Sequence, residues 1–114
     1  MGTKALTAKK NVVEIAKEFS RRIRALPGVE NAHVYLFGSA ARGDMDSDSD
    51  IDLLVVLDVY NKMIDTAISE AAFRLGLERD VLISELVYSR ERFESALFHA
   101  TPLYENIIKE GVIF

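Results

Sequence analysis

The run Ile-Asp-Leu-Leu-Val-Val-Leu at residues 51–57 constrains the fold of this chain more than any other stretch. Branched and aliphatic residues of this kind predict a strand. A strand that is apolar on both sides belongs in a sheet whose two faces are both covered. Asp52 interrupts the run, although a charged residue is almost never buried without a partner. We therefore expect a chemical reason for an aspartate at this position.

Composition narrows the class of protein. The 114 residues are the length of one domain, and 49% hydrophobic with 28% charged residues is typical of a globular chain. The absence of cysteine excludes thiol nucleophiles and cysteine-ligated zinc, and it fits a reducing cytoplasm. No run has the length of a signal peptide's apolar core or of a membrane span, so we expect a cytoplasmic protein without membrane contact. The net charge of −4 argues against direct binding of duplex nucleic acid.

Hydrophobic spacing and turn residues predict how helices and strands alternate along the chain. We expect strands at 32–37, 51–57 and 81–88, and helices at 7–26 and at 60–75 with Gly76 as its stop. A short helix capped by Ser89 should extend to about residue 98, and a last helix that begins at Thr101-Pro102 should stop at Gly111. This order indicates an α+β domain with a small mixed sheet of about three main strands covered by helices. Residues 1–114 form one expected domain, with an N-terminal helix at about 7–26, a core at about 29–88 and C-terminal helices at about 90–110.

A turn of small residues follows the first predicted strand. Gly38 permits a close backbone approach, the amides after it can point at an anion, and Ser39 adds a hydroxyl donor. The same two residues would also serve as an ordinary turn from strand to helix. Arg42 and Gly43 come one turn later, where the guanidinium can reach a phosphate or pair with a nearby aspartate. We treat Arg42 as an auxiliary residue of a candidate phosphate site.

Asp50 and Asp52 are the strongest candidates for chemistry. Residues two apart on a strand point to the same side, so both carboxylates can reach one cation. Hard oxygen ligands favour magnesium or manganese over zinc. Two like charges this close repel unless a cation or a proton compensates them. Asp50 alone also fits a simple turn cap, whereas Asp52 does not.

The preceding aspartates, Asp44, Asp46 and Asp48, alternate in a way that suggests a calcium-binding loop. Such a loop needs a glycine at its sixth position and a glutamate at its twelfth. Neither register that starts at Asp44 or Asp46 meets this requirement. We interpret these three residues as a solvated acidic loop.

A third carboxylate near the next strand would complete the pair. Asp80 at the start of that strand could act as the base that takes a proton from an attacking hydroxyl. Glu85 in the middle of the strand is the competing candidate. The two are an odd number of residues apart and so point to opposite sides. We favour Asp80, because a charge at the mouth of a strand is easier to hydrate.

Taken in order, Gly38-Ser39, Arg42-Gly43 and Asp50-Ile51-Asp52 resemble the signature of the DNA polymerase β nucleotidyltransferase superfamily, and the compact chain is similar to the prokaryotic minimal nucleotidyltransferases, MNT. The resemblance implies a polymerase β-like fold and a metal-dependent transfer of a nucleoside monophosphate, AMP from ATP, to a hydroxyl with release of pyrophosphate. It implies that the Gly38–Gly43 turn binds the nucleotide. It further implies that Asp50, Asp52 and Asp80 bind two Mg²⁺ ions, or Mn²⁺ in their place, and activate the acceptor.

Minimal members of this superfamily commonly accompany a helical HEPN protein, which they modify as antitoxins. The resemblance therefore implies a HEPN toxin as the acceptor. Two other hypotheses stay open: a catalytically silent antitoxin that neutralises its partner by occlusion, and a transferase for a small molecule or an RNA end. The apolar residues of the C-terminal helices could also support a homo-oligomer, although most of them must first cover the sheet.

Overall fold

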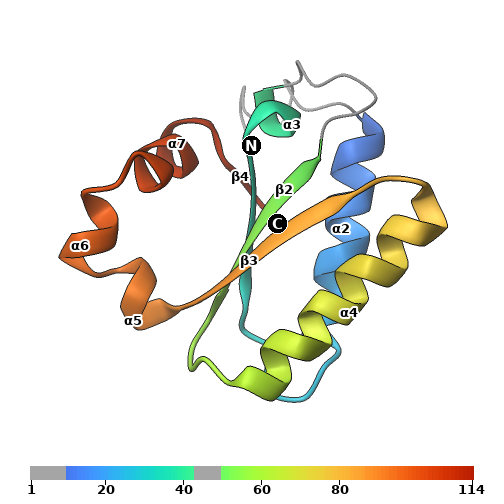
Figure 1. The fold of residues 1–114 in the computed structure, drawn as a ribbon, viewed down its shortest axis with the longest axis horizontal. Coiled ribbons are helices and arrows are strands. Elements are labelled where there is room, and N and C mark those ends of the chain that lie inside the picture. Colours follow the sequence, from blue (N-terminus) through green and yellow to red (C-terminus); the bar gives the residue numbers. More distant parts are fainter. Residues whose placement is uncertain (1–9, 43–49) are drawn as a thin grey trace.

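The computed structural model describes residues 10–42 and 50–114 (Figure 1). Along the chain, the elements are α2 (Lys10–Arg24), β1 (His33–Phe37), α3 (Ser39–Arg42), β2 (Ile51–Leu57), α4 (Lys62–Arg79), β3 (Ile83–Ser89), α5 (Arg90–Phe93), α6 (Ala96–His99), α7 (Pro102–Glu110) and β4 (Val112–Ile113). Among these described helices, none combines the length and the apolar character needed to cross a membrane.

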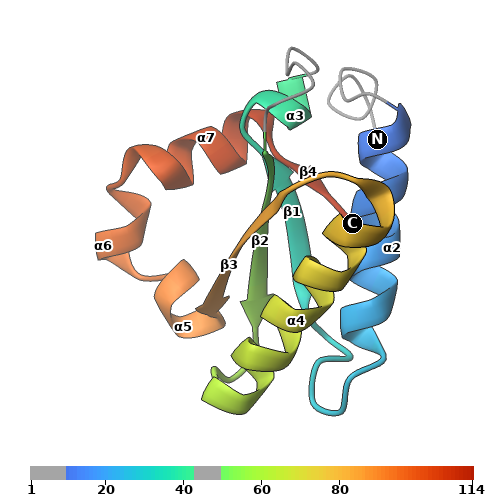
Figure 2. The same cartoon turned by 45° about the vertical axis from the view of Figure 1, so that its right-hand side comes forward.

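The strands form one mixed sheet in the order β3-β2-β1-β4. β2 pairs antiparallel with β1 and parallel with β3, while β4 adds two residues antiparallel to the outer side of β1. Helices α2 and α4 lie on one face of the sheet, and α5, α6 and α7 lie on the other (Figure 2). The predicted α+β architecture with three main strands is confirmed. The short strand β4 was not predicted, because two residues carry too little pattern to be recognised.

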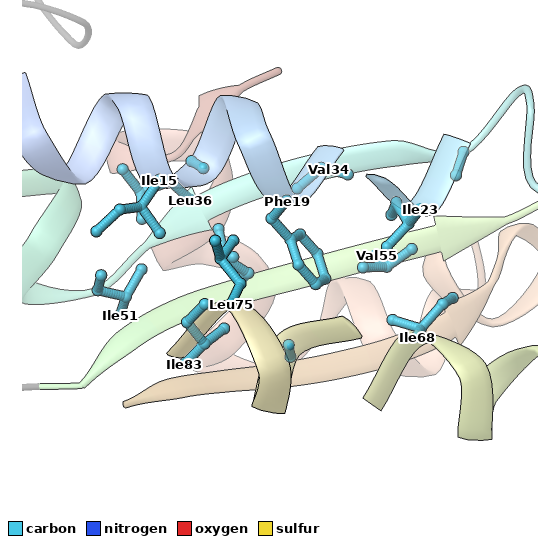
Figure 3. Packing of buried hydrophobic residues seen from close by; sticks show 14 of the residues in the cluster. Ile15, Phe19, Ile23, Val34, Leu36, Ile51, Val55, Ile68, Leu75 and Ile83 are labelled. Atoms are coloured by element: carbon cyan, nitrogen blue, oxygen red, sulfur yellow. The ribbon is translucent and has the colours of Figure 1, made fainter. Parts of the chain in front are cut away.

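The larger core lies between the sheet and the α2/α4 pair. α2 contributes a stripe of apolar residues at helical spacing, with Ile15, Phe19 and Ile23 turned to the sheet (Figure 3). Alternate residues of β2, among them Leu53 and Val55, pack against this stripe. We refer to this side of the sheet as the α2/α4 face.

The remaining buried residues of β2 point to the opposite side, the α5–α7 face. Leu54 and Val56 pack there against Phe98 of α6 and Ile107 of α7. β2 is thus covered on both faces, as its sequence predicts. Asp52 shares this face with Leu54, since the two residues are two apart on the strand.

Helix α4 differs from its predicted extent. Gly76 does not end it: the helix continues to Arg79, and Asp80 ends it in the left-handed conformation, with φ of 56°. Gly76 instead leaves room for the returning chain, because a Cβ atom there would lie 2.7 Å from the carbonyl oxygen of Val81. The prediction was wrong because the glycine serves close packing and not helix termination.

The segment after β3 also differs in detail. The sequence predicts one short helix that begins after Ser89 and extends to about residue 98. The structure has two, since the hydroxyl of Ser95 accepts a hydrogen bond from the amide of Phe98 and starts a new turn. Ser89 caps α5, and Thr101 with Pro102 starts α7, both as predicted.

Candidate active site

The predicted turn begins where β1 ends, Asp50 and Asp52 lie where β2 begins, and these two strand ends are neighbours (Figure 1). The antiparallel register of these two strands places Phe37 opposite Asp52. Gly38 follows Phe37 directly, so the turn begins beside the aspartate. Residues from two separate segments of the sequence are therefore neighbours at one end of the sheet.

Gly38 and Asp52 are in direct contact. Gly38 has φ of 76°, a conformation that side chains strongly disfavour. A Cβ atom at this residue would lie only 2.6 Å from Oδ2 of Asp52. The turn therefore requires glycine for two independent reasons, and the Asp52 carboxylate is directed at its backbone.

The turn continues into the single helical turn of α3. The amides of Ala41 and Arg42 donate to the carbonyl oxygen of Gly38, at 3.1 and 3.3 Å. Ala40 and Ala41 are fully buried against the sheet, which holds the turn in place. Ser39, half-buried at the start of this turn, consequently has a fixed position next to Gly38.

Asp52 lies in an unfavourable place for a negative charge. Burial raises the pKa of its carboxyl group above the ordinary 3.8, and the neighbouring charge of Asp50 raises it further. Both carboxylates are partly buried at the start of β2. A site that disfavours its own ionised form in this way gains from a bound cation.

Arg42 connects the turn to the C-terminal part of the fold. Its Nη1 atom donates to Oε1 of Glu110 at the end of α7, at 3.1 Å. This ion pair is partly exposed. The predicted residue Gly43 and the predicted acidic loop of Asp44, Asp46 and Asp48 lie outside the described residues.

The structure does not bring the predicted third carboxylate to the pair. Asp80 is the exposed C-cap of α4. Glu85 is aligned with Leu53, whose side chain packs on the α2/α4 face, and it accepts a hydrogen bond from Oγ of Ser69 in α4 at 2.7 Å. Across residues 10–42 and 50–114, no three acidic, histidine or cysteine side chains are grouped so that they could hold a metal ion. The residue of β3 in register with Asp52 is Ser84, which the sequence analysis missed because register is not visible in a single strand.

A comparison with known families identifies the class of protein. The chain matches the model of the nucleotidyltransferase domain family over residues 12–114. It belongs to this family. It is accordingly a nucleotidyltransferase enzyme, and its mixed sheet with helices on both faces is the polymerase β-like nucleotidyltransferase fold.

Two proteins of Methanocaldococcus jannaschii are similar to this nucleotidyltransferase. MJ0141 is 36% identical over 80 residues, which are 69% of this chain and 81% of the relative. MJ0604 is 32% identical over 102 residues, which are 89% of this chain and 95% of the relative. Both relatives are provisionally named protein adenylyltransferases.

Proposed function

We propose that this nucleotidyltransferase transfers AMP from ATP to a hydroxyl group of a protein. The observation that carries the proposal is the contact between the Asp52 carboxylate and the Gly38 backbone, which places a carboxylate beside a turn suited to phosphates. The names of the two relatives support AMP as the transferred group and a protein as the acceptor.

In the proposed reaction the acceptor oxygen attacks the α-phosphorus of ATP. A new bond forms between this oxygen and the α-phosphorus, the bond to the bridging oxygen of the β-phosphate breaks, and pyrophosphate leaves. The hydroxyl proton passes to a carboxylate oxygen of the site or to water. The hydroxyl of Ser39 and the amides of Ser39 and Ala40 at the start of α3 would orient the triphosphate, and Arg42 would assist them by exchanging its ion pair with Glu110 for a phosphate.

Asp50 and Asp52 are the residues that would hold a divalent cation. Their carboxylate oxygens are the donor type that Mg²⁺ and Mn²⁺ prefer, and the raised pKa of Asp52 is the expected effect of two like charges at a partly buried site. When bound, two Mg²⁺ ions would neutralise charge on the triphosphate and on the leaving pyrophosphate.

We further propose that the acceptor is a helical HEPN toxin and that the transfer neutralises it, so that the chain acts as an antitoxin in the cytoplasm, where ATP is available. The resemblance of the motif to minimal nucleotidyltransferases supports this partner.

The test uses the purified chain, Mg²⁺, ATP labelled on its α-phosphate and a purified helical HEPN protein as the candidate acceptor. We expect label on the partner, and at least about a 100-fold loss of labelling in Asp50→Asn and in Asp52→Asn, since removal of one group that stabilises transition-state charge costs roughly that much. Asp58→Asn is the matched control, because Asp58 follows the other end of β2 and pairs with Arg90. Labelling that survives both site substitutions in folded protein would contradict the proposal.

One observation favours the silent antitoxin as a second candidate. Within the described part of the chain, no third carboxylate joins Asp50 and Asp52. This candidate predicts tight partner binding by the wild type without incorporation of label, and the same affinity after Asp50 and Asp52 are both replaced by asparagine.

A further inference from the structure

We infer that Ser84 is the third side chain of the active site, so that a divalent cation held by Asp50 and Asp52 has a neutral hydroxyl beside it and, among residues 10–42 and 50–114, no third carboxylate. The inference rests on the proposed function, which supplies the cation. It follows from the alignment of β2 and β3, and it assigns to β3 a residue that the sequence motif does not contain.

The register of the two parallel strands places Ser84 directly beside Asp52. Ile51 is aligned with Ile83, Asp52 with Ser84 and Leu53 with Glu85. Aligned residues on neighbouring strands point to the same face, and the strands are about 4.8 Å apart. The Ser84 hydroxyl is therefore within reach of the same small space as the Asp52 carboxylate.

The packing of β3 gives independent support for this orientation. Ile83 and Val87 pack into the core on the α2/α4 face, whereas Leu86 and Tyr88 join the cluster on the α5–α7 face. By this alternation Ser84 shares the α5–α7 face with Asp52. Ser84 is exposed, so the helices that cover Leu86 and Tyr88 leave this end of the sheet open.

The two acidic residues near β3 do not occupy this position. Glu85 is turned to α4, where Ser69 holds its carboxylate. Asp80 ends α4 three residues before β3 begins, and its left-handed backbone belongs to that helix end. Leu82, two residues before Ser84 and just ahead of β3, is apolar and exposed.

A neutral residue at this position has a direct chemical consequence. Two carboxylates attract a divalent cation less strongly than three, and the remaining coordination positions fall to water and to the nucleotide. The Ser84 hydroxyl can hydrogen-bond such a water or the incoming acceptor. We therefore expect weak binding of the free cation, which a carboxylate introduced at residue 84 should strengthen.

The first experiment measures Mn²⁺ binding to the metal-free protein by the electron paramagnetic resonance signal of free Mn²⁺, without nucleotide or partner. We expect Ser84→Asp to bind Mn²⁺ about tenfold more tightly than the wild type, because affinity follows the charge of the ligand set. We expect Asp80→Asn to bind it as the wild type does. Ser89→Asp is the matched control: it adds the same charge at the far end of β3, at a helix cap that accepts aspartate.

A second pair of variants keeps the assignment testable if Ser84→Asp does not fold. The chain has no cysteine, so Ser84→Cys and Asp80→Cys each introduce a single thiol at an exposed position. We expect Mn²⁺ with ATP to slow alkylation of the first thiol at least about threefold by shielding it, and to leave the second unchanged.

The outcomes distinguish a failure of the proposed cation site from a failure of the role of Ser84. Mn²⁺ affinity that is unchanged in Asp52→Asn would overturn the cation site and with it the proposed function. Affinity that falls in Asp52→Asn but is unchanged in Ser84→Asp would overturn the role of Ser84 alone. Protection of the thiol at residue 80 without protection at residue 84 would overturn it as well.

Discussion

The two faces of the sheet differ in how completely they cover strand β2. On the α2/α4 face, the β2 residues Ile51, Leu53 and Val55 are at most 1% exposed under two long helices. On the α5–α7 face, Leu54 is equally buried, but Asp52 at the end of the strand is only partly covered. Asp52 is therefore covered differently from the apolar residues of the same strand, and substitutions should separate its role from theirs.

The largest effect on stability is expected on the α2/α4 face. Phe19 is 0% exposed, so Phe19→Ala should lower the free energy of unfolding by about 3–5 kcal/mol. Phe98→Ala, on the α5–α7 face, should cost roughly 2–3 kcal/mol, because its cavity lies in the smaller cluster and opens toward the surface. Denaturant unfolding measures both values. Equal losses would mean that the two faces are packed alike.

Substitutions at two glycines test whether the contact with Asp52 is needed for activity. Gly38→Ala and Gly76→Ala should each destabilise the fold by about 1–3 kcal/mol, since each added methyl meets an oxygen at less than 3 Å. Only Gly38→Ala displaces the Asp52 carboxylate. We therefore expect loss of labelling activity in Gly38→Ala and retained activity in Gly76→Ala, measured below the unfolding temperature of both variants.

Gly28→Ala is the control for backbone strain in this comparison. Gly28 has φ of 85°, close to that of Gly38, but a Cβ atom added there would meet Cδ1 of Ile64 at 3.4 Å and not a carboxylate oxygen. It should lose stability and keep its activity. Loss of activity in Gly28→Ala as well would show that strain alone, and not the contact with Asp52, explains the effect at Gly38.

In metal-free buffer, Asp52→Asn should raise the free energy of unfolding, by less than the glycine substitutions lower it. The folded protein raises the pKa of Asp52, so the ionised carboxylate destabilises the fold as the pH rises through that value. The advantage of asparagine should be full above the raised pKa and should vanish below the ordinary pKa of 3.8. Thermal unfolding over a pH series with a chelator measures it. A less stable variant at neutral pH would show that partners within the fold hold the carboxylate.

The smallest effect on stability is expected at the surface ion pairs of Arg22, which join α2 and α4. Arg22 pairs with Glu18 on its own helix and with Glu78 near the end of α4, and it lowers the pKa of both carboxyl groups. The stabilisation is present above their ordinary pKa of 4.5 and is lost as the pH falls through the lowered values. Arg22→Met should slightly lower the melting temperature at neutral pH and make no difference in acid. A deficit of the same size at both pH values would rule out an electrostatic cause.

Much of the fold follows from local pattern. The apolar run at 51–57 and the amphipathic helix before it predict a covered sheet, and the order of elements is confirmed with β4 added. The family follows from the spacing of Gly38, Asp50 and Asp52, and the family comparison confirms it. These features depend on residues that are close in the sequence, which is why a single chain reveals them.

The rest depends on contacts that no local pattern contains. The sequence predicts Asp80 and Glu85 on opposite sides of one strand, whereas Asp80 ends α4, and it does not show which residue of β3 is aligned with Asp52. The extent of α4 was also mispredicted at Gly76, because the hydrophobic pattern does not show that the chain turns back at Val81 and packs against the glycine. The roles of Asp50, Asp52 and Asp80 toward metal and nucleotide remain predictions for the experiments above.

The ion pair between Arg42 and Glu110 has a consequence for the order of events during synthesis. The two residues are 68 positions apart, and β4, which pairs with the strand leading into Gly38, is made later still. The ribosome must therefore release α7 and β4 before the turn at Gly38–Arg42 reaches its final contacts. A nascent chain that already contains every motif residue is still without the supports that hold the turn, so catalytic competence should arrive only with the last segment of the fold.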